Sequence, residues 1–262
     1  MSFYVTLPSN AISTQENFTG NFRVDLAHPL EFEGDWEVAL ASIQYPFSWD
    51  NFVEQSFTVY FDKSSIKVHL PSAHYENVKQ LVAALNTSYF DAVSSNAKIL
   101  SSKEGMTSAS TVSSIVKAVQ FSYNEIIKRV VITITKARAV LLNEHLHYTL
   151  GFSRDVSKFT STHKADFPPD FTGGFTSLFV YTDIIRPQMV GGIEAQLLKI
   201  VPIKGSYGDV IVKDYDSLHY VELLNKRFDS ISVAIKDDND TPVKFLYGKV
   251  ILKLHFRKKR FF

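Results

Sequence analysis

The chain has 262 residues, of which 28 are lysine or arginine and 27 are acidic, so its formal net charge is +1. This length suits one large all-β domain or two smaller ones, and the near-neutral charge gives no sign of a dedicated nucleic-acid-binding protein. The chain contains no cysteine, which excludes a disulfide framework, a thiolate metal site and a cysteine nucleophile.

Five short strands are predicted in the first 70 residues. Apolar and polar residues alternate there, and turn-forming residues interrupt the alternation at short intervals. Closely spaced short strands are typical of a sandwich or a barrel. The predicted strands are Phe3–Leu7, Phe18–Leu26, Asp35–Pro46, Ser56–Phe61 and Ile66–Leu70.

The N-terminal residues do not have the pattern of a targeting segment. They lack a basic stretch followed by an apolar run, and nowhere do about 18 uncharged apolar residues follow one another. We therefore expect a protein that is made in the cytoplasm or nucleus, is not secreted and has no membrane span.

The pattern changes between residues 71 and 172, which we predict to form an inserted α+β subdomain. A Ser-rich span near residues 94–114 predicts a loop, and a hairpin is expected to turn near Asn124. Gly151 follows a short predicted helix and suits its C-cap. A longer helix is predicted from apolar residues that recur on one helical face, namely Val78, Leu81, Val82 and Leu85.

Strands resume after residue 172, without the alternation of strands and helices that marks a nucleotide-binding sheet. The last two are predicted to form a long hairpin around the turn Asp237–Pro242. The blocks 1–70 and 173–262 together predict a mainly β protein, a single jelly-roll β-sandwich that is discontinuous in sequence. The predicted strands of the second block are Ser177–Ile185, Glu194–Ile203, Leu218–Leu224, Phe228–Ile235 and Val250–Phe256.

No residue pattern supports a metal site or an enzyme. Asp237, Asp238 and Asp240 offer three carboxylates, but the glycine and the glutamate of a calcium-binding EF-hand loop are missing, so a solvated turn is predicted. His145 and His147 are two residues apart in a predicted helix and point in different directions, which predicts surface or interface histidines.

Three other carboxylates, Asp166, Asp170 and Asp183, could in principle supply the pair that a glycosidase needs. Their positions relative to one another cannot be read from the sequence, and acidic residues in loops are usually solvated. No nucleophile with a recognisable histidine partner was found. We therefore predict no catalytic residue, no metal and no cofactor.

One cluster of cations, in the sequence "HFRKKRFF", stands near the C-terminus. Its members could contact nucleic-acid phosphate, a lipid surface or an acidic partner. The alternative is a solvated end after the last strand. The candidate residues are Arg257, Lys258, Lys259 and Arg260.

Aromatic residues are abundant, with 21 phenylalanines and 12 tyrosines. Such residues favour pleated strands and are enriched at the centres of interfaces. The composition therefore suits a β-rich protein that also buries surface against neighbouring molecules.

Several segments, taken in order, resemble the penton-type minor capsid proteins of Polinton (Maverick) elements and their adintovirus and virophage relatives. The similar segments are "FYVTLPSN", "GDWEVALASIQYP", "LGF", "LFVYTDIIRPQMVGG", "RFDSISVAIKDDNDTPVKF" and "GKVILKLHF". They cover both flanking blocks and touch the insertion, whereas the Ser-rich span matches nothing in that family.

The resemblance implies a structural protein of the virion. Such proteins have a single jelly roll and assemble as homopentamers at the vertices of an icosahedral capsid, beside a double jelly-roll major capsid protein. It implies no catalytic residues, and it places the basic tail at a subunit margin or in the capsid interior, where packaged DNA would be a partner. Since a fold does not fix a function, a carbohydrate-binding or glycan-cleaving jelly roll is the alternative.

Overall fold

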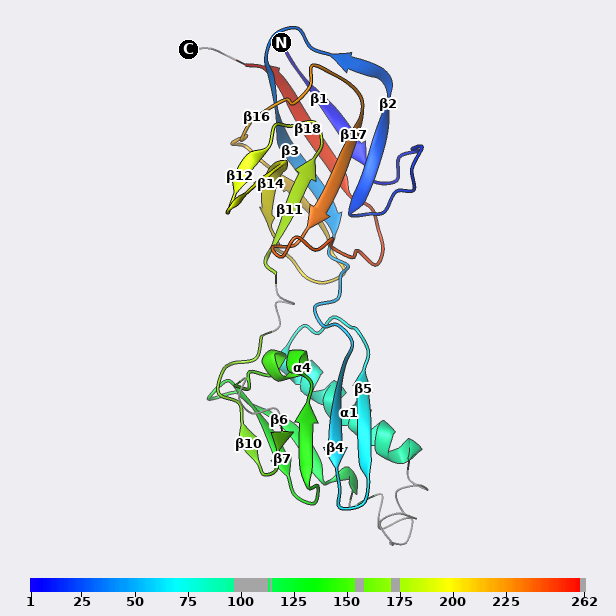
Figure 1. The fold of residues 1–262 in the computed structure, drawn as a ribbon, viewed down its shortest axis with the longest axis vertical. Coiled ribbons are helices and arrows are strands. Elements are labelled where there is room, and N and C mark those ends of the chain that lie inside the picture. The colour runs from blue at the N-terminus through cyan, green and yellow to red at the C-terminus, as the bar shows by residue number, and fades with distance from the viewer. Residues whose placement is uncertain (97–112, 114, 154–157, 171–174, 260–262) are drawn as a thin grey trace. The chain divides into compact units, whose positions relative to one another are not determined.

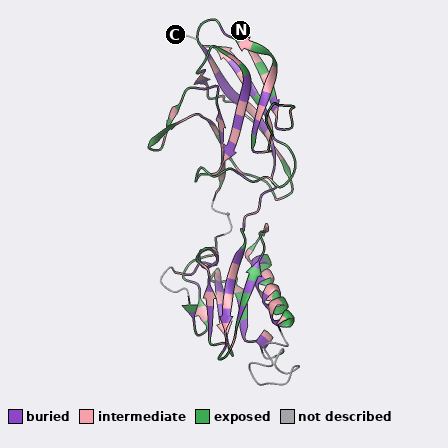
Figure 2. Cartoon of the chain, turned by 45° about the vertical axis from the view of Figure 1, so that its right-hand side comes forward, coloured by how far each residue is buried: buried purple, intermediate pink, exposed green. Residues whose placement is uncertain are grey.

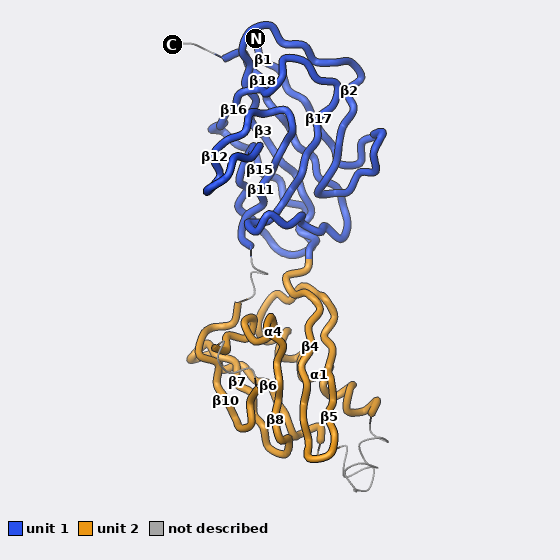
Figure 3. Tube along the Cα trace, viewed as in Figure 1, with its two compact units in different colours: residues 1–49, 175–262 blue, residues 50–174 orange. Residues whose placement is uncertain are grey.

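Two compact units make up the chain in the computed structural model (Figure 1). The structure describes residues 1–96, 113, 115–153, 158–170 and 175–259. Unit 1 consists of Met1–Trp49 and Phe175–Phe262, and unit 2 is the contiguous segment Asp50–Gly174 (Figure 3). Among the described residues, no helix is both long enough and apolar enough to cross a membrane.

Unit 1 is a sandwich of two antiparallel sheets. The first sheet has the strand order β1, β18, β3, β15, and the short strand β16 also pairs with β3. Every pairing in this sheet is antiparallel. Its strands are β1 (Ser2–Pro8), β3 (Trp36–Pro46), β15 (Val210–Asp214), β16 (Val221–Glu222) and β18 (Ile251–Lys258).

The second sheet has the strand order β14, β11, β17, β2. Apart from one hairpin and the short β16, the sandwich strands enter the two sheets in the nested order of a jelly roll, which confirms the predicted fold class. The strands of the second sheet are β2 (Asn21–Glu31), β11 (Ser177–Thr182), β14 (Leu197–Pro202) and β17 (Arg227–Lys236). The hairpin consists of β12 (Gln188–Val190) and β13 (Ile193–Ala195).

The predicted C-terminal hairpin is wrong, although both of its strands exist. β17 pairs with β11 and β2 in the second sheet, whereas β18 pairs with β1 and β3 in the first sheet. The segment between them crosses from one sheet to the other, and the backbone N–H of Leu246 donates to the carbonyl of Ser48 on the way. Alternation of apolar and polar residues predicts that one face of a strand is buried, but it does not predict which strand lies next to it.

The predicted boundary at residue 70 is also wrong, because β4 (Gln55–Tyr60) and β5 (Ser65–Leu70) belong to unit 2. β4 pairs with β5 on one side and with β8 (Ala139–Leu142) on the other. Its partner β8 lies far away in the sequence, so local periodicity could not assign these strands to unit 2.

Unit 2 combines two small antiparallel sheets with helices around one apolar core. Helix α1 (Val78–Ser95) confirms the predicted helix, and its N-cap Asn77 accepts a hydrogen bond from the backbone N–H of Gln80 at 3.1 Å. Most of the Ser-rich span 94–114 lies outside the described residues. The remaining elements are β6 (Val119–Asn124), β7 (Arg129–Ile134), α4 (Glu144–Thr149), β9 (Lys158–Phe159) and β10 (His163–Lys164).

Aromatic side chains fill both ends of the sandwich core. At one end of β3, the Phe256 ring stacks on Phe3 with ring centroids 5.1 Å apart, and Phe32 lies 5.1 Å from Trp36. At the other end Trp49 stacks on Phe47 at 4.3 Å. Buried residues run along the strands of both units in Figure 2. Many of the abundant aromatic residues therefore stabilise the interior rather than a surface.

The chain leaves the sandwich of unit 1 after Trp49 and returns to it at Phe175. These two points are adjacent, since the ring centroids of Trp49 and Phe175 lie 5.7 Å apart. We predict that replacing residues 50–174 by a Gly/Ser linker of about four to six residues leaves the sandwich folded. Both tryptophans of the chain, Trp36 and Trp49, lie in unit 1, so tryptophan fluorescence would follow its unfolding. Loss of a cooperative transition would show that the sandwich depends on unit 2.

Candidate interaction surfaces

The predicted basic residues do not form a separate tail. Arg257 and Lys258 belong to β18, where Arg257 is paired with Ser2 of β1 and with Glu37 of β3. The backbone N–H of Lys259 donates to the carbonyl of Asp35 at 2.9 Å. Arg260 lies outside the described residues.

Carboxylates of the same chain neutralise two of these cations. Nε of Arg257 donates to Oε1 of Glu37 at 2.5 Å, and the guanidinium lies 3.4 Å from the ring centroid of Tyr220. The ammonium of Lys259 pairs with Glu222, and this hydrogen bond lowers the pKa of the Glu222 carboxyl. A contact between this region and nucleic acid stays a prediction, and for Arg257 and Lys259 it would compete with these ion pairs.

A row of aromatic and basic side chains extends from these ion pairs along the outer face of the first sheet. Tyr220 shares a hydrogen bond of 2.7 Å with Nδ1 of His255, and the His255 ring lies 4.5 Å from that of Tyr4. Nζ of Lys253 lies 4.7 Å from the Tyr4 ring centroid. Burial lowers the pKa of His255, and the charge of Arg257 lowers it further. Both effects favour the neutral form of this imidazole.

A groove of about 620 Å³ lies beside Lys258, at the same end of the sandwich. Among its charged lining residues, Arg227 pairs with Glu31 at 3.3 Å and Lys226 pairs with Asp35 at 3.9 Å. The rings of Phe32 and Trp36 are only 7% and 9% exposed. They do not offer an open aromatic face on which a sugar ring could stack, so this groove does not favour the carbohydrate-binding alternative.

The candidate histidines lie on different sides of α4. His145 is exposed, whereas His147 is 3% exposed and packs 6.0 Å from the ring of Phe152. The expectation of surface or interface histidines is therefore wrong for His147, because its side of the short helix faces the core of unit 2. Within the described parts of the chain, no three His, Cys, Asp or Glu side chains are grouped to hold a metal ion.

The candidate carboxylates serve the backbone around them. Asp166 accepts from the backbone N–H of Ser153 at 3.0 Å in unit 2, and Asp183 accepts from that of Ser232 at 2.9 Å in unit 1. The backbone N–H of Asp170 donates to the carbonyl of Thr149. The carboxylates of Asp166 and Asp183 therefore stabilise local backbone structure, each within its own unit.

The acidic turn after β17 is organised in the same way. Oδ1 of Asp237 accepts from the backbone N–H groups of Asn239 and Thr241, at 2.9 and 2.8 Å. Asp240 adopts a φ of 61° and pairs with Lys236 at 2.7 Å. The Asp237 carboxylate therefore shapes the turn, as the solvated-turn prediction expects.

Sequence reasoning missed the apolar surface of unit 1. The hairpin β12–β13 exposes Met189 by 72% and Ile193 by 66%, and the edge strand β15 exposes Val210 and Val212 by 60% each. Alternation predicts which face of a strand is apolar but cannot show that the face is left uncovered.

The chain resembles a solved capsid structure over its whole length. The crystal structure of the mavirus penton protein aligns with a TM-score of 0.52 at 12% sequence identity, and the alignment covers 99% of this chain and 100% of that one. A chain of the Sputnik virophage cryo-EM structure aligns with a TM-score of 0.48 at 9% identity, and the alignment covers 98% of each chain. No protein-family model and no curated protein sequence matches the chain. The jelly-roll sandwich with its inserted unit is therefore the fold of the mavirus penton protein.

Proposed function

We propose that this protein is a penton, a structural capsid protein that forms homopentamers at the vertices of an icosahedral virion. One observation carries the proposal: the alignment with the mavirus penton protein covers unit 2 as well as the sandwich. A jelly roll shared for general reasons of packing would be expected to align with unit 1 alone.

The surface of unit 1 supports a role in assembly rather than in catalysis. Several of its carboxylates, among them Glu37, Asp183 and Glu222, are engaged in local structure, whereas several apolar side chains are left in solvent. Partners in this proposal are further copies of the chain and a double jelly-roll major capsid protein, with packaged DNA as a contact of the basic strand end. No described feature favours the carbohydrate-binding alternative.

We predict that the purified protein forms a pentamer with a mass close to five chains in light scattering. A closed ring uses two different flanks of each subunit, and stable interfaces bury roughly 1,200 to 2,000 Å². With a net charge of only +1, mutual repulsion is small, so assembly should depend little on salt. Single chains at every protein concentration would contradict the proposal, and negative-stain images should show fivefold rings.

A further inference from the structure

A short arm projects from one flank of the sandwich. The arm is the segment Gln188–Ala195, which contains β12, β13 and the two glycines between them, and these strands pair only with each other among the described residues. Its apolar side chains Met189 and Ile193 are 72% and 66% exposed. A Cβ added to either Gly191 or Gly192 would meet no atom within 4 Å, so the tip stands in open space.

The base of the arm is fixed to the sandwich. Nε2 of Gln188 donates to the carbonyl of Leu197 in β14 at 2.7 Å. Nε2 of Gln196 donates to the carbonyls of Ile185 and Asp183, at 2.8 and 3.0 Å. The arm therefore presents its apolar side chains from a defined position, which reduces the entropy lost when they bind.

A groove of about 470 Å³, lined by both apolar and polar residues, lies at the opposite edge of the same sheet. One wall is the segment 17–21 that leads into β2, with Phe18 61% exposed, and the other is the segment 242–245 after β17. A Cβ at Gly20 would lie 3.1 Å from the Phe245 ring and 2.9 Å from the carbonyl oxygen of Val243. Glycine at this position allows the two walls to meet at the floor.

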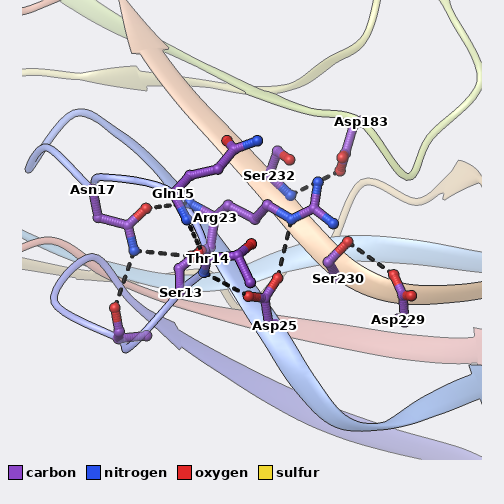
Figure 4. Close-up of polar contacts among 11 residues, drawn as sticks. Ser13, Thr14, Gln15, Asn17, Arg23, Asp25, Asp183, Asp229, Ser230 and Ser232 are labelled. Carbon is purple, nitrogen blue, oxygen red and sulfur yellow. Dashed lines mark hydrogen bonds and ion pairs between the residues drawn. The ribbon is translucent and has the colours of Figure 1, made fainter.

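Polar contacts hold the first wall in place (Figure 4). The Asn17 side chain donates to the carbonyl of Arg23 at 2.9 Å and accepts from its backbone N–H at 2.8 Å. Asp25 accepts from the backbone N–H of Thr14 at 2.9 Å and from Nε of Arg23 at 3.1 Å. These donors lower the pKa of the Asp25 carboxyl, which stays charged and keeps the loop on β2. The groove is thus formed before any partner arrives.

The arm and the groove are complementary in position and in charge. The arm is anchored to β14 and the groove adjoins β2, which are the two edges of the second sheet, and Figure 1 shows β12 and the loop ahead of β2 on opposite sides of the sandwich. Glu194 is the only ionisable residue of the arm, and Lys244 is the only one that lines the groove. Within the described residues, neither forms an ion pair.

We propose that the arm of one copy of this protein inserts Met189 into the groove of the next copy, with Glu194, its cross-strand neighbour on the same face of the arm, facing Lys244. The inference rests on the proposed vertex role. A contact between opposite flanks is heterologous, and it generates a closed ring when the rotation between successive copies closes, as the fivefold symmetry of the proposed vertex requires. The groove volume exceeds the roughly 300 Å³ at which pockets begin to enclose whole ligands, so it has room for this side chain of Met189.

Disulfide trapping tests the contact directly, because the natural chain has no cysteine. The double variant Met189→Cys, Phe18→Cys should give, after oxidation, a ladder of linked chains that ends at five on a non-reducing gel. Each single variant should stay unlinked, and a mixture of the two should give only pairs. Efficient linking of Met189→Cys to itself would show a twofold contact and overturn the inference.

Charge exchange provides a second test with a matched control. Glu194→Lys and Lys244→Glu should each raise the concentration needed for half assembly by about three- to tenfold, and the double exchange should restore it. The control is Ile126→Asp. Ile126 lies in the turn between β6 and β7 and is 92% exposed, more than Met189 or Ile193, and its replacement should leave assembly unchanged.

The outcomes separate this inference from the proposed function. Pentamers of the unaltered protein with no cross-link and no rescue by charge exchange would refute the arm contact and leave the vertex role standing. Single chains of the unaltered protein under all conditions would refute both. A ladder together with charge rescue would support both.

Discussion

Replacing Phe256 by alanine is expected to destabilise the sandwich by about 3–5 kcal/mol, the usual cost of removing a fully buried phenyl ring. Phe256 is fully buried in β18. Its ring is nearly parallel to that of Phe3, with an interplanar angle of 6°, and lies 5.8 Å from that of Phe32. The change would leave a cavity between the two sheets, which their paired backbones could not close by collapsing.

Denaturant unfolding followed by tryptophan fluorescence would measure this loss, because Trp36 packs against Phe32 in the same cluster. Phe90→Ala is the matched control: Phe90 lies on α1 of unit 2 and is 51% exposed, so the tryptophan transition should not move. A shift below about 1 kcal/mol for Phe256→Ala would mean that the aromatic cluster is loosely packed.

Gly151→Ala should destabilise unit 2 by about 2–5 kcal/mol, from the left-handed backbone and from overlap with its neighbours. Gly151 has a φ of 83°, and an added Cβ would lie 2.2 Å from the carbonyl oxygen of Phe167. This glycine ends α4 in a Schellman motif: its N–H donates to the carbonyl of Tyr148, and that of Phe152 donates to the carbonyl of His147. An alanine could be accommodated only by moving the segment around Phe167.

Far-UV circular dichroism would detect the unfolding of unit 2, whereas the tryptophan transition of unit 1 should stay in place. Gly208→Ala separates the two causes, since Gly208 has a φ of 93° but its nearest neighbour to an added Cβ is the Tyr247 hydroxyl at 3.8 Å. It should cost only the 1–2 kcal/mol or so of the backbone conformation. Equal losses for the two variants would show that the contact with Phe167 gives way easily.

Local patterns in the sequence were enough to predict the elements but not their partners. The face of α1, the turn near Asn124 and the cap at Gly151 each depend on a few neighbouring residues, and the structure confirms them. The sheet to which β17 or β18 belongs depends on strands far away in the chain. Alternation is identical for either choice, so the false hairpin and the misplaced boundary at residue 70 have the same cause.

The interaction surfaces were predicted less completely, for a related reason. Arg257 and Lys259 stood out as charges, but their partners Glu37 and Glu222 come from other strands and carry no local mark in the sequence. Met189 and Ile193 fell between two predicted strands, and their exposure could not be predicted because it is a property of the assembled fold. The only sequence feature that could have indicated this exposed arm was the Gly-Gly pair with apolar residues on both sides of it.

The pairing of β1 with β18 sets the order in which the chain can fold during synthesis. β18 is the central partner of both β1 and β3, so the first sheet stays incomplete until nearly the whole described chain has been translated. Unit 2 is contiguous in sequence and can fold earlier, when β1 and β3 have been translated but their partner β18 has not. Until then β1 and β3 have open edges on the ribosome, and the newly made sandwich strands are at their most vulnerable to aggregation.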